Sequence, residues 1–329
     1  MTVALRLALA ASLIFALAGC NKIQSALSPQ GAEAAQVATL FWIMTWVSAA
    51  ILLGVMILAA IAIFGRERWR SPLRGEWIVI GGGIVFPSVL LSALLVAALL
   101  MIGAESSSRA GPASVRIAVV GEQWWWRVVY RTPDGRRVES ANEIRIPAGE
   151  RVAFELSAAD VIHSLWVPTL AGKLDMIPGR ENVLNVIANE PGVSRGQCAE
   201  YCGGAHALMS LYVVALERQE FDAWLQREAA PAPAPAAGAA AGQKLFFAGG
   251  CGACHTIRGT EAAGTIGPDL THLGGRMSLA AAVLPNDAAA IARWIRDNQH
   301  IKPDNKMPPY GMFTEAELKS LANYLAGLK

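Results

Sequence analysis

Charged side chains are scarce in this chain, and their scarcity excludes several classes of protein. Of its 329 residues only 16% are charged, 53% are hydrophobic, and the net charge is +2. A chain so weakly basic, without a basic patch interleaved with aromatic residues, is not expected to bind nucleic acid. The sequence also lacks a Ser/His/Asp set, a carboxylate pair and a phosphate-binding loop, so neither a hydrolase nor a kinase is indicated.

Cysteine is rare as well, and none of the five cysteines is left over for a disulfide framework. The first, Cys20, follows Leu-Ala-Gly after an apolar run that extends from Leu7 to Leu17. A short apolar run that ends in small residues is typical of a cleaved signal peptide, here residues 1–19. The Leu-Ala-Gly-Cys order resembles a bacterial lipobox, which predicts a lipoprotein with Cys20 lipidated. The alternative is an ordinary signal with a chance cysteine.

Two long uncharged runs follow, over residues 37–64 and 77–103. Each exceeds the ~20 apolar residues needed to cross a bilayer, so we expect a hairpin of two transmembrane helices. The loop between them, residues 65–74, carries four arginines, and the positive-inside rule places such a loop in the cytoplasm. The rest of the chain is then expected on the outer face of a bacterial inner membrane.

From residue 114 to residue 226 the pattern changes to short segments of alternating apolar and polar residues, separated by turn residues. This spacing is typical of a β-sandwich or barrel. A loop between two such strands would be held by a rigid scaffold. We expect strands over residues 115–119, 127–130, 143–146, 152–156 and 210–216.

One segment of this region concentrates side chains that bind metals. It holds Cys198, Cys202, His206 and Met209, separated by small residues. Thiolates and thioethers are soft ligands, and a Cys/His set joined by methionine is the ligand set of a cupredoxin copper site. Two thiolates can also bridge two copper ions. The alternatives are a disulfide between the two cysteines, and zinc, whose structural sites use cysteine and histidine but not methionine.

The last part of the chain follows a linker over residues 229–242, which is rich in alanine, proline and glycine. The domain beyond it, residues 243–329, contains Cys251-Gly-Ala-Cys254-His255. In a Cys-x-x-Cys-His motif the two thiols form thioethers to haem and the histidine binds iron. A thioredoxin-like Cys-x-x-Cys is the alternative, but no βαβ pattern surrounds this motif.

Two helices are expected in this domain, one before the motif and one at the C-terminus. The second opens with Thr314 and Glu317, which fit a capping box. Such an arrangement resembles the small class I cytochrome c fold, and residues 267–270 resemble the proline-bearing loop on the histidine side of its haem. The C-terminal helix carries an apolar stripe of Leu318, Leu321, Leu325 and Leu328.

The second iron ligand is expected to be a methionine downstream of the motif, since a Met/His pair raises the haem potential. Met277, Met307 and Met312 are the candidates. We favour Met307, because it lies in a proline-rich loop that resembles the family's Met-Pro element, and interpret the other two as packing residues. His272 and His300 have no assigned task.

Together these motifs resemble subunit II of the bacterial haem-copper cytochrome c oxidases that carry a fused cytochrome c domain. The order Cys-x-Glu-x-Cys-x-x-x-His-x-x-Met is the signature of the family's binuclear copper A centre, and residues 198–209 fill every position. His163, the only histidine before His206, lies in a segment that resembles the family's first ligand segment. The resemblance implies that Cys198 and Cys202 bridge two coppers, with His163 and His206 as terminal ligands.

The resemblance also implies weaker ligands. Met209 would bind one copper and the backbone carbonyl of Glu200 the other, while the Glu200 carboxylate would face a magnesium or manganese ion shared with subunit I. A Gln-Trp-Trp-Trp stretch resembles the family's Gln-Trp-Tyr-Trp and makes Trp124 the tryptophan at which electrons enter; core packing is the alternative. Glu76 is the one candidate for a proton-channel carboxylate, although its spacing to Pro87 departs from the family pattern.

The resemblance therefore predicts a multidomain chain: a transmembrane hairpin, a β-sandwich of cupredoxin type, and a small all-α cytochrome c. Electrons would pass from an external donor, such as a cytochrome c or a cytochrome bc complex, through the haem and the copper pair to subunit I. There oxygen would be reduced to water and protons pumped, with subunits I and III as partners. Two alternatives remain: the small subunit of a copper A-type nitric oxide reductase, and a non-catalytic membrane protein that delivers copper. A quinol oxidase subunit is disfavoured, because that relative lacks the copper ligands.

Overall fold

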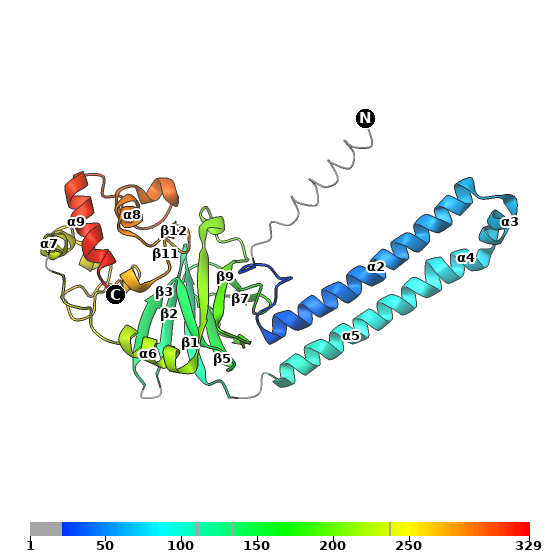
Figure 1. Cartoon of the computed structure of the whole chain (residues 1–329), viewed down its shortest axis with the longest axis horizontal. Coiled ribbons are helices and arrows are strands. Elements are labelled where there is room, and N and C mark those ends of the chain that lie inside the picture. Colours follow the sequence, from blue (N-terminus) through cyan, green and yellow to red (C-terminus); the bar gives the residue numbers. More distant parts are fainter. Residues whose placement is uncertain (1–21, 109–111, 133–134, 237) are drawn as a thin grey trace. The chain divides into compact units, whose positions relative to one another are not determined.

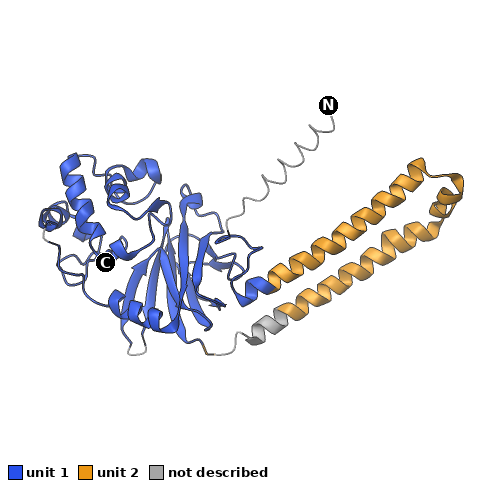
Figure 2. Ribbon diagram, viewed as in Figure 1, with its two compact units in different colours: residues 1–35, 113–329 blue, residues 36–112 orange. Residues whose placement is uncertain are grey.

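The computed structural model describes residues 22–108, 112–132, 135–236 and 238–329. It divides into two compact units: unit 1, residues 1–35 with 113–329, and unit 2, residues 36–112 (Figure 2). The expected signal peptide, residues 1–19, and the lipidation site Cys20 lie outside the described residues, so both stay predictions.

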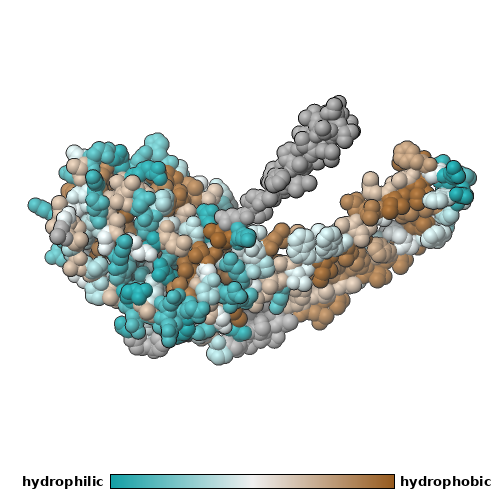
Figure 3. Space-filling model, in the orientation of Figure 1, coloured by the Kyte–Doolittle hydropathy of each residue, from teal (hydrophilic) through white to brown (hydrophobic). Residues whose placement is uncertain are grey.

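Unit 2 consists of helices that expose apolar side chains along their length. Two of them, Ala32–Phe64 and Glu76–Met101, are long and apolar enough to cross a membrane by length and composition. Their surfaces are predominantly hydrophobic (Figure 3). The helical elements are α2 (Ala32–Phe64), α3 (Glu67–Arg70), the 3-10 helix η1 (Ser71–Arg74), α4 (Glu76–Ile80), the π-helical η2 (Gly81–Val85) and α5 (Phe86–Ser108).

The two expected apolar helices are thus present, with two differences in detail. The first helix begins at Ala32 and not at residue 37, with Glu33 in its first turn, where an acidic side chain interacts favourably with the helix dipole. The second contains the π-helical turn Gly81–Val85, just before Pro87. A proline has no N–H for the carbonyl four residues earlier, so the hydrogen-bond pattern changes where it enters a helix.

Unit 1 contains a β domain of two five-stranded sheets (Figure 1). Their strand orders are β3-β2-β1-β5-β8 and β4-β10-β9-β6-β7, and a single hydrophobic core that includes Trp126, Phe154 and Leu165 lies between them. The first sheet contains β1 (Val115–Glu122), β2 (Trp125–Arg131), β3 (Arg137–Ala141), β5 (Val152–Ala158) and β8 (Asn182–Val186). The second sheet contains β4 (Glu143–Pro147), β6 (His163–Trp166), β7 (Leu174–Met176), β9 (Gly192–Cys198) and β10 (Ser210–Leu216).

All five strands expected from alternation are present, and they are the strands with clear apolar alternation or apolar runs. The other five were not predicted. β6 and β7 have four and three residues, too few to show a period, and β9 is rich in glycine and polar residues. Strands of that kind form because a neighbouring strand offers backbone partners: β9 pairs with β10 and with β6.

The helix α6 (Arg218–Glu228) closes the β domain. Its side chains Phe221 and Trp224 are buried against Tyr130, whose ring centroid lies 5.1 Å from that of Trp224. The segment after α6 lies on the helical C-terminal domain, where Ala232 N donates to Arg258 O at 2.9 Å. The first helix of that domain begins at Ala240, inside the range expected for the linker.

The last domain is helical and has its own core, which includes Phe246, Leu321 and Tyr324. The capping box predicted at Thr314 is confirmed, with both reciprocal hydrogen bonds to Glu317. All four leucines of the predicted stripe are buried. The elements are α7 (Ala240–Ala248), η4 (Cys251–Ala253), η5 (Leu273–Gly275), β11 (Ser278–Leu279), β12 (Leu284–Pro285), α8 (Ala288–Ile301) and α9 (Glu315–Ala326).

Candidate copper and haem sites

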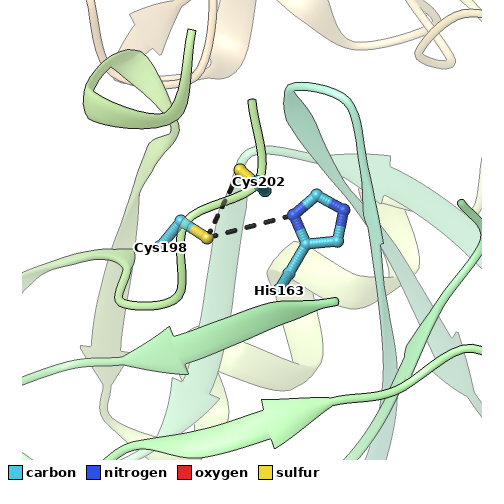
Figure 4. A group of neighbouring side chains, drawn as sticks. All are labelled: His163, Cys198 and Cys202. Atoms are coloured by element: carbon cyan, nitrogen blue, oxygen red, sulfur yellow. Dashed lines mark hydrogen bonds between the residues drawn. The ribbon is translucent and has the colours of Figure 1, made fainter. Parts of the chain in front are cut away.

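Two thiols lie at the centre of the first site. Cys198 ends β9 and Cys202 lies in the loop that follows, while His163 opens the neighbouring strand β6 (Figure 4). The sulfur atoms are 3.8 Å apart, and Cys198 Sγ lies 3.9 Å from His163 Nδ1. A disulfide requires about 2.05 Å between sulfurs, so the thiols are free. All three side chains are buried, with their ligating atoms within 4.8 Å of one another.

The remaining predicted ligands surround the same two sulfurs. His206 Nδ1 lies 3.5 Å from Cys202 Sγ, and Met209 Sδ lies 3.9 Å from it. On the other side, the backbone oxygen of Glu200 lies 3.2 Å from Cys198 Sγ. The tertiary structure therefore brings all six side chains or carbonyls named from the sequence into one cluster, with one imidazole beside each thiol.

The electrostatics of the thiol pair fit a bound cation. The hydrogen bond from the Cys202 thiol lowers the pKa of Cys198 to about 3, while the same contact, with burial, raises the pKa of Cys202. A second negative charge beside the first is strongly disfavoured in this buried place unless a cation compensates it. Soft sulfur ligands with imidazole suit copper. The residues present therefore fit a copper centre.

Asp160 supports the first histidine and was missed by the sequence analysis. Its Oδ1 lies 2.9 Å from His163 Nε2, which leaves Nδ1 directed toward Cys198. A carboxylate on the far nitrogen of a metal-binding histidine fixes the ring and its tautomer. Gly121 packs so closely on this ring that a Cβ there would lie 2.7 Å from His163 Cδ2. The sequence signal was an Asp-x-x-His spacing, too common to be read alone.

Trp124 contacts the segment of residues 198–209 that carries most of the candidate copper ligands, called the copper loop below. The tryptophan approaches it from the side of the first sheet. Its indole Nε1 donates to Cys202 O at 3.0 Å, and Gln123 Nε2 donates to the same oxygen at 2.8 Å. The tryptophan is only 7% exposed. The tryptophan therefore packs in the core and contacts the backbone of the copper loop directly, and its predicted role in electron entry stays a prediction.

The Glu200 carbonyl faces the thiol pair, but the Glu200 side chain points toward the surface. Its carboxylate is about half exposed and lies 3.5 Å from Lys173 Nζ. An exposed carboxylate with a lysine neighbour is an ordinary surface pair in the isolated chain. The magnesium or manganese assignment therefore rests on what a partner subunit would add, and it stays a prediction.

The second site is built around His255. Its Nδ1 donates to Pro268 O at 2.7 Å, which leaves Nε2 free to bind iron. The loop predicted from residues 267–270 is thus confirmed on the histidine side. A Cβ at Gly267 would lie 2.5 Å from His255 Cε1, so only glycine lets the loop approach the ring. Burial lowers the pKa of His255, which keeps the imidazole neutral as iron binding requires.

A cavity opens in front of this histidine. It holds about 1460 Å³ of space not filled by protein atoms, counted to its opening on solvent. Cys251, Cys254, His255 and Met307 all line it, together with apolar side chains of α8 and α9. A flat apolar group with thioether links and two axial ligands matches this lining. The residues present therefore fit a covalently attached haem.

The competing methionines and histidines lie outside this cavity. Met277 and Met312 are 44% and 74% exposed, and neither lines it. His272 is held by Ala230 O at 3.1 Å, and His300 lies at the surface 2.7 Å from Asp297 Oδ1. Neither histidine belongs to the copper cluster or to the lining of the haem cavity.

The β domain and the helical domain thus define the class: a cupredoxin-like domain with a candidate copper loop, followed by a c-type cytochrome domain. Two family models match the chain. Residues 131–216 match the model described as the periplasmic domain of cytochrome c oxidase subunit II, and residues 239–329 match the model for cytochrome c. These domains suggest copper A and haem c as cofactors.

Curated relatives agree with this assignment. Cytochrome c oxidase subunit 2 of Alkalihalophilus pseudofirmus is 38% identical over 74% of this chain and 71% of its own length. The protein of the same name from Bacillus sp. PS3 is 32% identical over 74% and 72% of the two chains. This chain therefore belongs to the cytochrome c oxidase subunit II family, in the form with a fused cytochrome c domain.

A solved structure also resembles part of the chain. The periplasmic domain of subunit II of cytochrome oxidase from Bradyrhizobium japonicum is 30% identical, with a TM-score of 0.34. The match covers 36% of this chain and 95% of that one. The family assignment confirms the predicted fold class, a pair of apolar helices with a cupredoxin-like and a cytochrome c domain. It also implies that the chain works with other subunits of a haem-copper oxidase.

Proposed function

We propose that this chain is the electron-transfer subunit of a terminal respiratory oxidase in a bacterial inner membrane. It would receive electrons in its cytochrome c domain and pass them through its copper domain to subunit I. The observation that carries this proposal is the cluster around two thiols 3.8 Å apart, in the same compact unit as the haem cavity. Membership of the subunit II family supports it.

The copper domain would hold its metals with side chains from three elements. Cys198 and Cys202 would bridge two coppers, and His163 and His206 would each bind one through Nδ1. Met209 and the Glu200 carbonyl would complete the set as weak ligands. Copper bound this way accepts and releases one electron. The surrounding residues keep the site dry and prevent the ligands from moving, since all three residues of the central group are buried.

The cytochrome domain would attach haem through Cys251 and Cys254, with His255 and Met307 on its two faces. The hydrogen bond from His255 to Pro268 orients the ring, and the apolar lining excludes water from the cavity. Both effects favour a stable Met/His pair and a high haem potential. An external donor, such as a cytochrome c or a cytochrome bc complex, would then reduce this domain.

Trp124 would connect the two sites, because it lines the haem cavity and donates to Cys202 O. Subunit I would accept the electrons, reduce oxygen to water and pump protons, with subunit III beside it. The Glu200 carboxylate would meet a magnesium or manganese ion at the contact with subunit I. The arginines in residues 66–74 would lie in the cytoplasm, with both redox domains on the outer face.

Electron paramagnetic resonance and optical spectra of the full-length chain in detergent, after copper loading and haem maturation, test this proposal. The expected result is one unpaired electron shared by two equivalent coppers, together with a c-type haem spectrum. The variant Cys202→Ser should lose the shared signal and keep the haem spectrum, and Cys254→Ala should do the reverse.

The rival functions predict different results. A copper-delivery protein would show mononuclear, readily exchangeable Cu(I), and that outcome would refute the electron-transfer role. A nitric oxide reductase subunit would give the same spectra. The purified complex separates those two, because an oxidase consumes oxygen with a reduced donor and the reductase consumes nitric oxide.

A further inference from the structure

A buried lysine joins the cytochrome domain to the β domain. Lys302 follows α8 directly and precedes Met307 by five residues, yet only 3% of its surface is exposed. Its ammonium group donates to Trp124 O at 2.5 Å and to Ala280 O at 3.1 Å. Burying a cation is costly, and burial lowers the pKa of Lys302 to about 7. An apolar side chain would fill this space at a lower cost in desolvation free energy. We therefore attribute the lysine at this position to the two hydrogen bonds that it donates.

The tryptophan held by Lys302 contacts the copper loop with its other end. The Trp124 carbonyl accepts from Lys302, while its indole donates to Cys202 O at 3.0 Å. Both residues line the haem cavity. Lys302 therefore acts on a residue that touches both the cavity and the copper loop.

The second acceptor of Lys302 belongs to a strained turn. Ala280, Ala281 and Ala282 have φ values of 54°, 62° and 61°, a left-handed conformation that alanine avoids. Ala281 O accepts from Ser210 N at 3.1 Å, and Ala282 O accepts from an Arg195 guanidinium nitrogen at 3.3 Å. Strained backbone persists only where its surroundings hold it. Here the β domain and Lys302 together hold three successive carbonyls.

The chain between Lys302 and Met307 continues along the copper loop. Lys306 Nζ lies 3.7 Å from Asp160 Oδ2, the carboxylate that holds His163. A Cβ at Gly204 would lie 2.6 Å from Asp304 Oδ2, so the Asp304 carboxylate packs directly on the copper loop. Three residues of one short segment thus contact the supports of the copper ligands.

We propose that Lys302 is a positioning residue that holds the cytochrome domain on Trp124, so that electrons leave the haem domain through this contact. The proposal rests on the proposed function for the electron step. In that step one electron would leave the haem iron, which is thereby oxidised, and enter the copper pair, which is thereby reduced, and no bond would form or break. Lys302 itself neither binds a cofactor nor carries the electron; it sets the distance between the two domains.

The test uses the full-length chain with Lys302→Met, which keeps the side-chain length and removes both hydrogen bonds. The first readout is hydrogen exchange, because the Ser210 amide is bonded to Ala281 O across the domain contact. We expect peptides containing Ser210 to exchange about tenfold faster, as two buried carbonyls lose their donor. The second readout is the rate of haem-to-copper electron transfer after rapid reduction, which should fall about tenfold or more.

Two further variants make the result specific. Lys319→Met makes the same chemical change on the exposed face of α9 and should alter neither readout. Lys302→Gln keeps a shorter hydrogen-bond donor and should give an intermediate effect on both readouts. It replaces Lys302→Met as the test variant if that variant does not fold. Both metal spectra should match the wild type in every variant, which shows that the sites themselves are intact.

The outcomes separate the two proposals. If exchange at Ser210 and the transfer rate both stay within about twofold of wild type, Lys302 is a buried packing residue and the inference is wrong. If the wild type itself lacks the shared copper signal or the haem spectrum, the proposed function fails. Hydrogen exchange then decides alone whether Lys302 holds the domains together.

Discussion

The two ring nitrogens of His163 face different groups. This arrangement decides which nitrogen is directed toward the candidate copper ligands. Nδ1 faces Cys198 Sγ at 3.9 Å, while Nε2 lies 2.9 Å from Asp160 Oδ1. Asp160 also accepts from the backbone N–H groups of Gln123 and Val161, at 2.8 Å each. These bonds hold the carboxylate in place and help to lower its pKa against the effect of burial. The histidine is therefore oriented before any metal binds.

Asp160→Asn tests this orientation. The amide keeps the shape of the side chain but loses its charge, so the ring is held less firmly and its basicity falls. Copper affinity should drop about 10- to 100-fold, as for other changes to groups that support metal-binding histidines. Competitive titration with a copper chelator measures it. Asp297→Asn makes the same change in a surface aspartate paired with a histidine, His300, and should leave copper affinity unchanged; an equal loss there would assign the effect to surface charge.

Met307→Ala tests the second haem ligand. Because Met307 lines the cavity and the exposed Met312 does not, the loss of the thioether should free one face of the iron. The haem potential should fall by about 0.1 V or more, since the axial ligands set it. A redox titration followed by absorbance measures this. Met312→Ala should keep the wild-type potential, and the reverse pattern would assign the ligand to Met312.

Single residues differ in how far the sequence predicts them. Most of the candidate copper and haem ligands stand in spaced motifs whose chemistry requires those residue types, so residue type and spacing are enough to name them. His163 and Met307 were named because the segments around them resemble those of the family. Asp160 and Lys302 act through the contacts that they make in the folded chain. Lys302 contacts a residue distant in the sequence, and the spacing between Asp160 and His163 is common in any sequence. An aspartate three residues before a histidine, or a lysine after a helix, says nothing until the fold shows what it touches.

At the scale of elements, the copper site depends on strands that the sequence predicts poorly. β6 and β9 carry His163 and Cys198, and their pairing places Leu165 opposite Cys198. That register brings the start of one strand beside the end of the other. Short or glycine-rich strands obtain their conformation from neighbours, so local propensity could not find them.

The C-terminal helix α9 shows the opposite case, where local signals suffice. Thr314 caps it by accepting from Glu317 N, and its buried leucines pack on the haem domain core. Thr314→Ala should destabilise this domain by about 1 kcal/mol, because one helix-end N–H loses its partner. Denaturant unfolding followed by haem absorbance in the full chain measures it. Thr314→Ser keeps the hydroxyl and should cost only a small part of that, and an equal loss would point to the methyl group.

At the scale of the whole molecule, the chain consists of two units whose surfaces suit different surroundings. The helices of residues 36–112 expose apolar side chains such as Leu52 and Val96, at 63% and 55%. The other unit buries its apolar side chains in two cores. Apolar surfaces of that extent on helices this long are consistent with membrane anchoring.

The arginine-rich turn between the helices predicts the orientation in the membrane. An epitope tag inserted at Ser71 should react with antibody only after the inner membrane is permeabilised. A tag after Lys329 should react in intact spheroplasts, because the proposed topology places the redox domains on the outer face. The C-terminal tag is the control for antibody access, and a Ser71 tag that reacts without permeabilisation would reverse the topology.

The sequence by itself determined the apolar helices, the alternating strands, the ligand motifs of both sites and the family. Each depends on residue types at short, regular spacing, where local physics and chemistry act directly. Only the tertiary structure decided which residues surround those ligands: Asp160 on His163, Lys302 on Trp124, and Trp124 on Cys202. Such contacts join residues between 3 and 178 positions apart, and burial and backbone hydrogen bonding select them only once the whole chain has folded.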